Sequence, residues 1–164
     1  MFPRKGIPIG NLTSQIFANI YMNEFDQFIK HTLRVKNYLR YTDDFLIISE
    51  NLEYLKGLIN KLRLFLREEL QLEMHPKKVS IMKYDQGIDF LGYVIFPYHV
   101  LLRRKTWKRI IRNIKNKIYS YKQGMVSEES LKQTLQSYLG VLSHAHAYKL
   151  SEYLKNQFWF WMKE

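Results

Sequence analysis

The chain has 164 residues, of which 46% are hydrophobic and 15% aromatic, and it carries a formal net charge of +11. This composition excludes a disordered chain and predicts one or two compact units with buried cores. The lack of cysteine excludes a disulfide framework and thiolate metal sites, and no apolar stretch approaches the roughly 20 residues that span a bilayer. We therefore expect a cytoplasmic protein without a membrane partner.

The positive charge is concentrated in the last third of the chain. Residues 1–100 carry 13 Lys and Arg against 11 Asp and Glu, whereas residues 101–164 carry 13 against 4. Nine of these basic residues lie between Arg103 and Lys122, a segment without an acidic residue. A one-sided positive field favours a polyanion as partner, most often nucleic acid. A basic helical surface that serves only solubility is the alternative.

Loop and helix signals begin the chain. Gly6–Asn11 is expected to be a loop, because it contains two glycines and a proline. Apolar residues then recur at helical spacing over Thr13–Arg34, and the hydroxyls of Thr13 and Ser14 can cap the first amides. A second amphipathic helix is predicted over Asn51–Leu70, with Asn51 as its cap.

Between these helices, Tyr38–Ser49 is predicted to form a β-hairpin with Asp43 and Asp44 at its tip. Two runs rich in β-branched and aromatic residues flank the polar residues of the turn. Neighbouring carboxylates at such a tip need a cation, a basic partner or a raised pKa. An ordinary acidic turn is the alternative, because Asp is common in turns.

Three further strands are predicted after the second helix. They are Val79–Met82, Ile88–Phe96 and Val100–Leu102, and the last two are expected to pair. Together with the hairpin and the helices, they predict an α+β fold for residues 1–103.

Residues 104–164 are predicted to form an all-α bundle of three helices. The first follows Thr106 and ends before Gly124, the second is capped by Ser127, and the third spans about His144–Trp161. The tryptophans that we expect to pack within the bundle rather than against bases are Trp107, Trp159 and Trp161.

Motifs along the whole chain are similar, in order and spacing, to those of the second half of a reverse transcriptase. Gly6–Gln15, followed by Ala18–Asn19, resembles the family's motif B, and Tyr41–Asp44 resembles motif C, the Y-x-D-D box. Leu72–Lys78 resembles motif D, and Phe90–Tyr93 resembles motif E, the primer grip. The predicted bundle resembles the thumb.

This resemblance implies a partial polymerase palm over residues 1–103, an antiparallel sheet with two packed helices, followed by a thumb of three helices over residues 104–164. It implies an RNA-directed DNA polymerase that transfers nucleotides by a two-metal mechanism. The implied partners are an RNA template, a DNA primer and a dNTP, and the implied cofactor is a pair of Mg²⁺ ions, for which Mn²⁺ can substitute.

The same resemblance implies catalytic residues. Asp43 and Asp44 would hold the metals, and Asp43 is the better ligand, because on an extended strand Asp44 would point the other way. Lys77 or Lys78 would neutralise the triphosphate or protonate the leaving pyrophosphate. Two solvated lysines after a turn are the alternative.

Other positions would contact the nucleic acid. Asn19 is equally well explained as a helix-surface amide that bonds local backbone. Leu91 and Gly92 would let the strand backbone press against the terminal sugar of the primer, and a buried strand with a bulge at Gly92 is the alternative. The residues expected at the nucleotide and template are Gly6, Ile9, Gly10, Ser14, Gln15, Asn19 and Tyr41. The residues expected along the duplex phosphates are Arg103, Arg104, Lys105, Lys108, Arg109, Arg112 and Lys115.

Two positions point to a subfamily. Most reverse transcriptases have Gln and Pro where this chain has Ile9 and Gln15. The resulting I-G-N-L-T-S-Q is similar to the enzymes of diversity-generating retroelements, with retron and group II intron enzymes as alternatives. An accessory retroelement protein is then a conceivable partner. The apolar Ile9 removes a hydrogen-bonding group, which could loosen base discrimination.

The family's motif A, an F-x-x-x-D strand with another metal-binding aspartate, would lie upstream of motif B, but only five residues precede Gly6. We therefore expect that the 164 residues alone do not polymerise, and that palm surfaces left uncovered cause self-association. The alternatives are a non-catalytic nucleic-acid-binding protein and a degenerate relic that keeps the palm and thumb fold.

Overall fold

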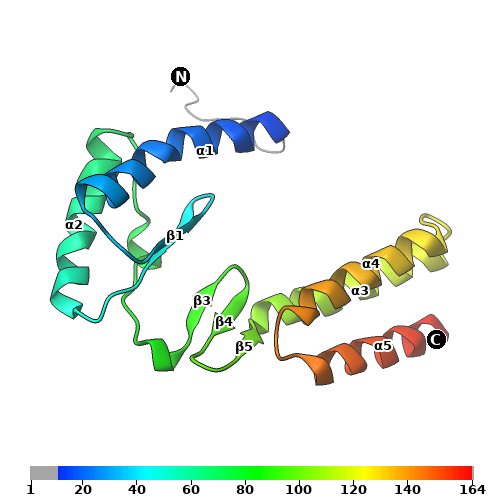
Figure 1. Ribbon diagram of the computed structural model, residues 1–164. Coiled ribbons are helices and arrows are strands. Elements are labelled where there is room, and N and C mark those ends of the chain that lie inside the picture. The colour runs from blue at the N-terminus through cyan, green and yellow to red at the C-terminus, as the bar shows by residue number, and fades with distance from the viewer. Residues whose placement is uncertain (1–10, 164) are drawn as a thin grey trace. The chain divides into compact units, whose positions relative to one another are not determined.

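The computed structural model describes residues 11–163 and shows an α+β protein with two compact units (Figure 1). The first unit extends to Ile81 and the second begins at Met82. The predicted loop lies, up to Gly10, outside the described residues. No helix within residues 11–163 is both long and apolar enough to cross a membrane.

Helix α1 (Leu12–Gln27) continues into a π-helical turn, η1 (Phe28–Thr32), so the helical segment ends close to where it was predicted to end. Its cap is Asn11, whose side-chain oxygen accepts a hydrogen bond from the Thr13 amide at 3.2 Å. The prediction of hydroxyl caps was wrong, because the helix begins before Thr13 and Asn11, two residues earlier, already bonds a free amide.

The predicted hairpin is confirmed. Strands β1 (Tyr38–Tyr41) and β2 (Asp44–Ile47) pair antiparallel and leave two residues for the turn. Helix α2 (Leu52–Glu68) follows, and its predicted cap is also confirmed, because the Asn51 side chain accepts from the Tyr54 amide at 2.9 Å. The buried core of this unit consists of Phe25, Ile29, Val35, Leu58, Leu62, Leu66 and Leu70.

Helix α1 also carries apolar side chains that this core does not cover. Ile16, Phe17, Ile20 and Tyr21 are between 47% and 62% exposed.

The strand predicted over Val79–Met82 does not form. The segment lies between two short 3₁₀ turns, η2 (Pro76–Lys78) and η3 (Tyr84–Gln86), and has no strand partner among the described residues. Its β-branched residues favour an extended backbone, but a strand exists only where a neighbour supplies the paired hydrogen bonds.

The second unit contains a three-stranded antiparallel sheet in the order β3 (Ile88–Phe90), β4 (Tyr93–Ile95) and β5 (Val100–Leu102). The predicted pairing with the last strand is confirmed. The single strand predicted over Ile88–Phe96 is instead a hairpin, because the chain reverses at Leu91 and Gly92, whose φ angles are +51° and +89°.

Three helices complete the second unit, as predicted: α3 (Arg104–Lys122), α4 (Glu128–Ser143) and α5 (Tyr148–Lys163). Gly124 (φ +71°) follows α3, and Ser127 caps α4 by accepting from the Ser130 amide at 3.2 Å. The residues buried between the helices are Ile110, Ile114, Ile118, Leu131, Leu135, Leu142, Ala147, Leu154 and Phe158.

Two expectations for the bundle were wrong. Helix α5 begins at Tyr148 rather than at His144, because His146 pairs with the sheet: its Nδ1 accepts from the Val100 amide at 3.0 Å, and its own amide donates to the Val100 carbonyl at 2.8 Å. Trp159 is 54% exposed and lies outside the buried core, which it meets through an edge-on contact with Phe158, whereas the other two tryptophans pack against this core.

Candidate active site and nucleic-acid surface

The turn between β1 and β2 consists of Thr42 and Asp43, and Asp44 is the first residue of β2. Both aspartates are exposed, and Asp44 lies opposite Tyr41 in the hairpin register. The Thr42 hydroxyl donates to Oδ1 of Asp43 at 2.9 Å. Because Asp43 lies in the turn and not in an extended strand, strict alternation of side chains does not separate the two carboxylates.

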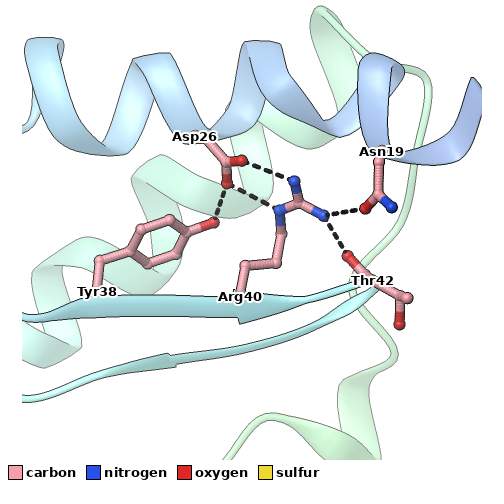
Figure 2. A network of polar contacts seen from close by, with 5 residues as sticks. All are labelled: Asn19, Asp26, Tyr38, Arg40 and Thr42. Carbon is pink, nitrogen blue, oxygen red and sulfur yellow. Dashed lines mark hydrogen bonds and ion pairs between the residues drawn. The ribbon is translucent and has the colours of Figure 1, made fainter. Parts of the chain in front are cut away.

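An arginine fastens this turn to helix α1 (Figure 2). The Nε and Nη2 atoms of Arg40 donate to the two carboxylate oxygens of Asp26 at 2.8 and 2.7 Å. Its Nη1 donates to the Asn19 side-chain oxygen at 3.2 Å and to the Thr42 carbonyl at 2.7 Å. The Tyr38 hydroxyl also donates to Asp26, at 2.6 Å. We call these five residues the Arg40 network.

The Arg40–Asp26 pair at the centre of the Arg40 network is largely shielded from water, whereas Asn19 and Thr42 at its edge are exposed. The Arg40 and Asp26 side chains are 10% and 21% exposed. The hydrogen bond from Arg40 lowers the pKa of Asp26 below its ordinary value, and burial together with the Asp26 carboxylate raises the pKa of Tyr38. Helix α1, whose first turns belong to the motif B-like segment, is therefore held to the motif C-like hairpin by the charged, bidentate contact between Arg40 and Asp26.

Sequence reasoning did not find Asp26, Tyr38 or Arg40. A weak signal was present, because Tyr38 and Arg40 alternate onto one face of β1, while Asn19 and Asp26 are seven residues apart on one face of α1. Nothing local, however, indicates that these two faces meet.

The other residues predicted at the nucleotide are only partly brought together. The Asn19 side-chain oxygen accepts from Arg40 and not from local backbone, whereas the contact of Asn19 with the nucleotide stays a prediction. Ser14 is half-buried and Gln15 exposed in the first turn of α1, and Tyr41 is 59% exposed. The predicted contacts that lie outside the described residues are Gly6, Ile9 and Gly10.

Lys77 and Lys78 lie together in the 3₁₀ turn η2 and are both exposed. His75 caps this turn, with its Nδ1 accepting from the Lys77 amide at 3.3 Å. Among residues 11–163, no ion pair or hydrogen bond joins either lysine to the aspartates of the hairpin.

The aspartate pair is the candidate metal site. Within the described part of the chain, no group of three or more His, Asp and Glu side chains is placed to hold an ion. Neither Asp43 nor Asp44 forms an ion pair with a described residue, and the one hydrogen bond to their carboxylates among residues 11–163 comes from the Thr42 hydroxyl. One or two carboxylates suit Mg²⁺, which keeps several waters and takes further oxygens from substrate phosphates.

In the second unit, Leu91 and Gly92 form the tip of the β3–β4 hairpin. The Gly92 carbonyl accepts from the Arg103 amide at 2.9 Å, and a Cβ at Gly92 would lie 3.2 Å from the Thr106 hydroxyl. The tip is thus a tight turn next to the start of α3, which rules out the alternative of a bulged strand, while the primer-grip role of Leu91 and Gly92 stays a prediction. The Arg103 guanidinium donates to Asp89 through both Nε and Nη2, so it bonds within the sheet.

Helix α3 presents the basic surface. Its buried isoleucines recur on one face, and α3 contains no acidic residue. We define the basic face of α3 by six of its exposed cations, which are Arg104, Lys105, Lys108, Arg109, Arg112 and Lys115. A row of exposed cations on one helix is suited to phosphate groups, to which they bind without regard to sequence.

A family model described as reverse transcriptase (RNA-dependent DNA polymerase) matches residues 1–95, more than half of the chain. The chain belongs to the reverse transcriptase family. No curated protein matches it. The matched stretch of this reverse transcriptase family member includes the Asp43–Asp44 turn, the Arg40 network and the Leu91–Gly92 tip, whereas the three-helix bundle lies beyond it.

The lowered pKa of Asp26 predicts acid sensitivity for the first unit of this family member. A carboxyl group with a lowered folded-state pKa adds stability above its ordinary value of 3.8, and this stability is lost as the pH falls through the folded-state pKa. We expect the free energy of unfolding to fall below about pH 4 in wild type and to fall less steeply in Asp26→Asn. Urea unfolding at several pH values measures both slopes, and equal slopes would contradict the assignment.

Thr42 has a φ of +53°, a left-handed conformation that is unusual for a β-branched residue. Asn tolerates this region better, so Thr42→Asn is expected to raise the free energy of unfolding by about 0.5–1 kcal/mol. Thr42→Val keeps the β-branch and should give no gain. Chemical denaturation of the three proteins decides this, and a less stable Asn variant would argue against strain at the turn.

Proposed function

We propose that these residues form the palm and thumb part of an RNA-directed DNA polymerase, which extends a DNA primer on an RNA template. The observation that carries this proposal is the Asp43–Asp44 turn, which lies within the matched stretch and is fastened by Arg40 to α1. Nucleotide addition needs carboxylates at fixed positions, because a small displacement of the reacting groups has a large effect on rate. A hairpin whose turn carbonyl is bonded to a helix-anchored arginine meets this need.

In the proposed reaction, the 3′-hydroxyl oxygen of the primer forms a bond to the α-phosphorus of the dNTP. The bond from that phosphorus to the bridging oxygen breaks, pyrophosphate leaves, and the hydroxyl proton passes to solvent. Asp43 and Asp44 would hold Mg²⁺ or Mn²⁺, with Asp43 as the principal ligand. Such ions, when bound, stabilise negative charge on the attacking and leaving oxygens. Lys77 and Lys78 would neutralise the triphosphate.

The remaining assignments concern the path of the nucleic acid. Ser14, Gln15 and Tyr41, with the three motif B-like residues outside the described part, would border the template base and the incoming nucleotide. The Leu91–Gly92 tip would contact the end of the primer, and the basic face of α3 would follow the phosphates of the duplex.

Primer extension tests the proposal. A labelled DNA primer on an RNA template, given dNTPs and Mg²⁺, should be extended in a template-directed way by the polymerase that contains these residues. Extension should stop when a chelator removes the divalent cation. Binding of the primer–template without extension at any Mg²⁺ or Mn²⁺ concentration would contradict the proposed activity.

We further propose that the chain belongs with the diversity-generating retroelement enzymes, on the basis of Ile9 and Gln15. If the missing amide at position 9 loosens base selection, Ile9→Gln should lower misincorporation opposite template adenine about tenfold. Ile9→Leu, which adds no hydrogen-bonding group, should not lower it. Sequencing of the extended products measures both error rates, and an unchanged adenine error rate in Ile9→Gln would exclude this explanation.

A second candidate function is nucleic-acid binding without catalysis, which the basic face of α3 favours. It predicts binding that weakens steeply with salt and does not depend on Asp43 or Asp44. Substitution of Asp43, treated in the Discussion, separates the two functions.

A further inference from the structure

A groove of about 500 Å³ lies between α3 and α5, outside the stretch that matches the family model. Six residues from the two helices line it, four from α3 and two from α5. They are Arg104, Trp107, Lys108, Ile111, Leu150 and Tyr153.

The groove combines aromatic rings with an apolar floor. The ring centroids of Trp107 and Tyr153 are 6.0 Å apart, and the ring planes are inclined by 59°. Tyr153 is 48% exposed, while Trp107, Ile111 and Leu150 are half-buried against the bundle core. An exposed aromatic ring beside a partly covered one offers a flat, apolar ligand two surfaces for contact.

The charge along this edge of α3 is positive. Arg104 and Lys108 are exposed at the groove, and two helical turns further on Lys115 Nζ lies 4.6 Å from the ring centroid of Trp161 on α5. Within α3 and α5 the only acidic residue is Glu152, which pairs with Lys155 at 2.9 Å. Cations and aromatic rings thus occur together along one seam, with little opposing charge.

From this combination we infer that the α3–α5 groove binds unpaired nucleotides of a single nucleic-acid strand. A positively charged groove follows the backbone of a single strand, and aromatic rings stack on its bases without regard to sequence. A duplex cannot use the rings in this way, because its base faces are already stacked. The inference rests on the proposed function. It assigns the cations of α3 that border the groove to the single strand and leaves Lys105, Arg109 and Arg112, which point outward, to the duplex phosphates.

Tyr153→Ala tests the inference in the full chain. Its affinity for labelled oligothymidylate and oligouridylate, measured by fluorescence anisotropy, should fall about tenfold, since base–aromatic stacking contributes this much or more. Its affinity for a labelled RNA–DNA hybrid should stay within about twofold. The two single strands distinguish a DNA from an RNA occupant. Tyr153→Phe, which retains the ring, should bind like wild type.

Tyr119→Ala is the matched control, because Tyr119 is 64% exposed on α3, one of the two helices that form the groove, but does not line it. It should change neither affinity, and circular dichroism should show that all variants are folded. An equal loss of single-strand and hybrid binding in Tyr153→Ala, or no loss at all, would overturn the inference. A wild-type chain that binds the single strands but not the hybrid would leave the inference standing and would instead argue against the proposed contact with duplex phosphates.

Discussion

In the polymerase that contains these residues, Asp43→Asn is expected to lower the rate of primer extension by about three orders of magnitude. The substitution removes the charge of the principal proposed metal ligand and keeps its size, and Asp43 is exposed, so folding should be unaffected. A loss of about 4 kcal/mol in stabilisation of the transition state corresponds to that decrease in rate. Single-turnover extension on an RNA template, at saturating enzyme and Mg²⁺, measures it.

Asp85→Asn is the matched control for this experiment, because it makes the same change at an exposed aspartate in the 3₁₀ turn η3. It should extend the primer like wild type. Asp43→Asn should still bind the primer–template, since the basic face of α3 is unchanged. If Asp43→Asn extended the primer at the wild-type rate, the turn would not be a catalytic site, and binding without catalysis would be the better account.

Arg40→Ala is expected to lower the free energy of unfolding of the first unit by about 2–3 kcal/mol. The substitution removes both bonds to the Asp26 carboxylate and leaves that mostly buried group with the Tyr38 hydroxyl as its remaining partner in the network. It also releases the Thr42 carbonyl. All three tryptophans lie in the second unit, so urea unfolding of the first unit is best followed by hydrogen exchange of its amides.

Lys56→Ala provides the comparison, because Lys56 and Glu53 form an ion pair in which both side chains are more than half exposed. Its removal should lower the free energy of unfolding by less than about 1 kcal/mol. In a double-mutant cycle, Arg40→Ala and Asp26→Ala should be strongly non-additive. Additive effects would mean that the two residues stabilise the unit independently, contrary to the Arg40 network.

The elements that sequence predicted well are those whose signals are local. The hairpin at Asp43 follows from two β-rich runs around a polar turn, and the caps at Asn51 and Ser127 follow from side chains that bond amides three residues away. The three helices of the bundle follow from apolar spacing. In each case the residues that determine the structure are neighbours in the chain.

What could not be predicted depends on distant partners. The Arg40–Asp26 contact joins residues that are 14 apart in the chain. His146 lies outside helix α5 because it bonds Val100, which is 46 residues away. Val79–Met82 has the composition of a strand but no neighbour to pair with. The turn at Leu91 and Gly92 was missed because leucine gives no turn signal and a single glycine within a strand pattern also indicates a bulge.

The central claim is that Asp43 and Asp44 together hold a divalent cation, and paramagnetic broadening tests it most directly. Substoichiometric Mn²⁺ is added to the isotopically labelled chain, and the amide signals are compared with those of Asp43→Asn. We expect the signals of residues 42–45 to broaden first in wild type and to remain sharp in the variant. Equal broadening in both proteins, or broadening that spares the turn, would contradict the assignment of this hairpin as the metal site.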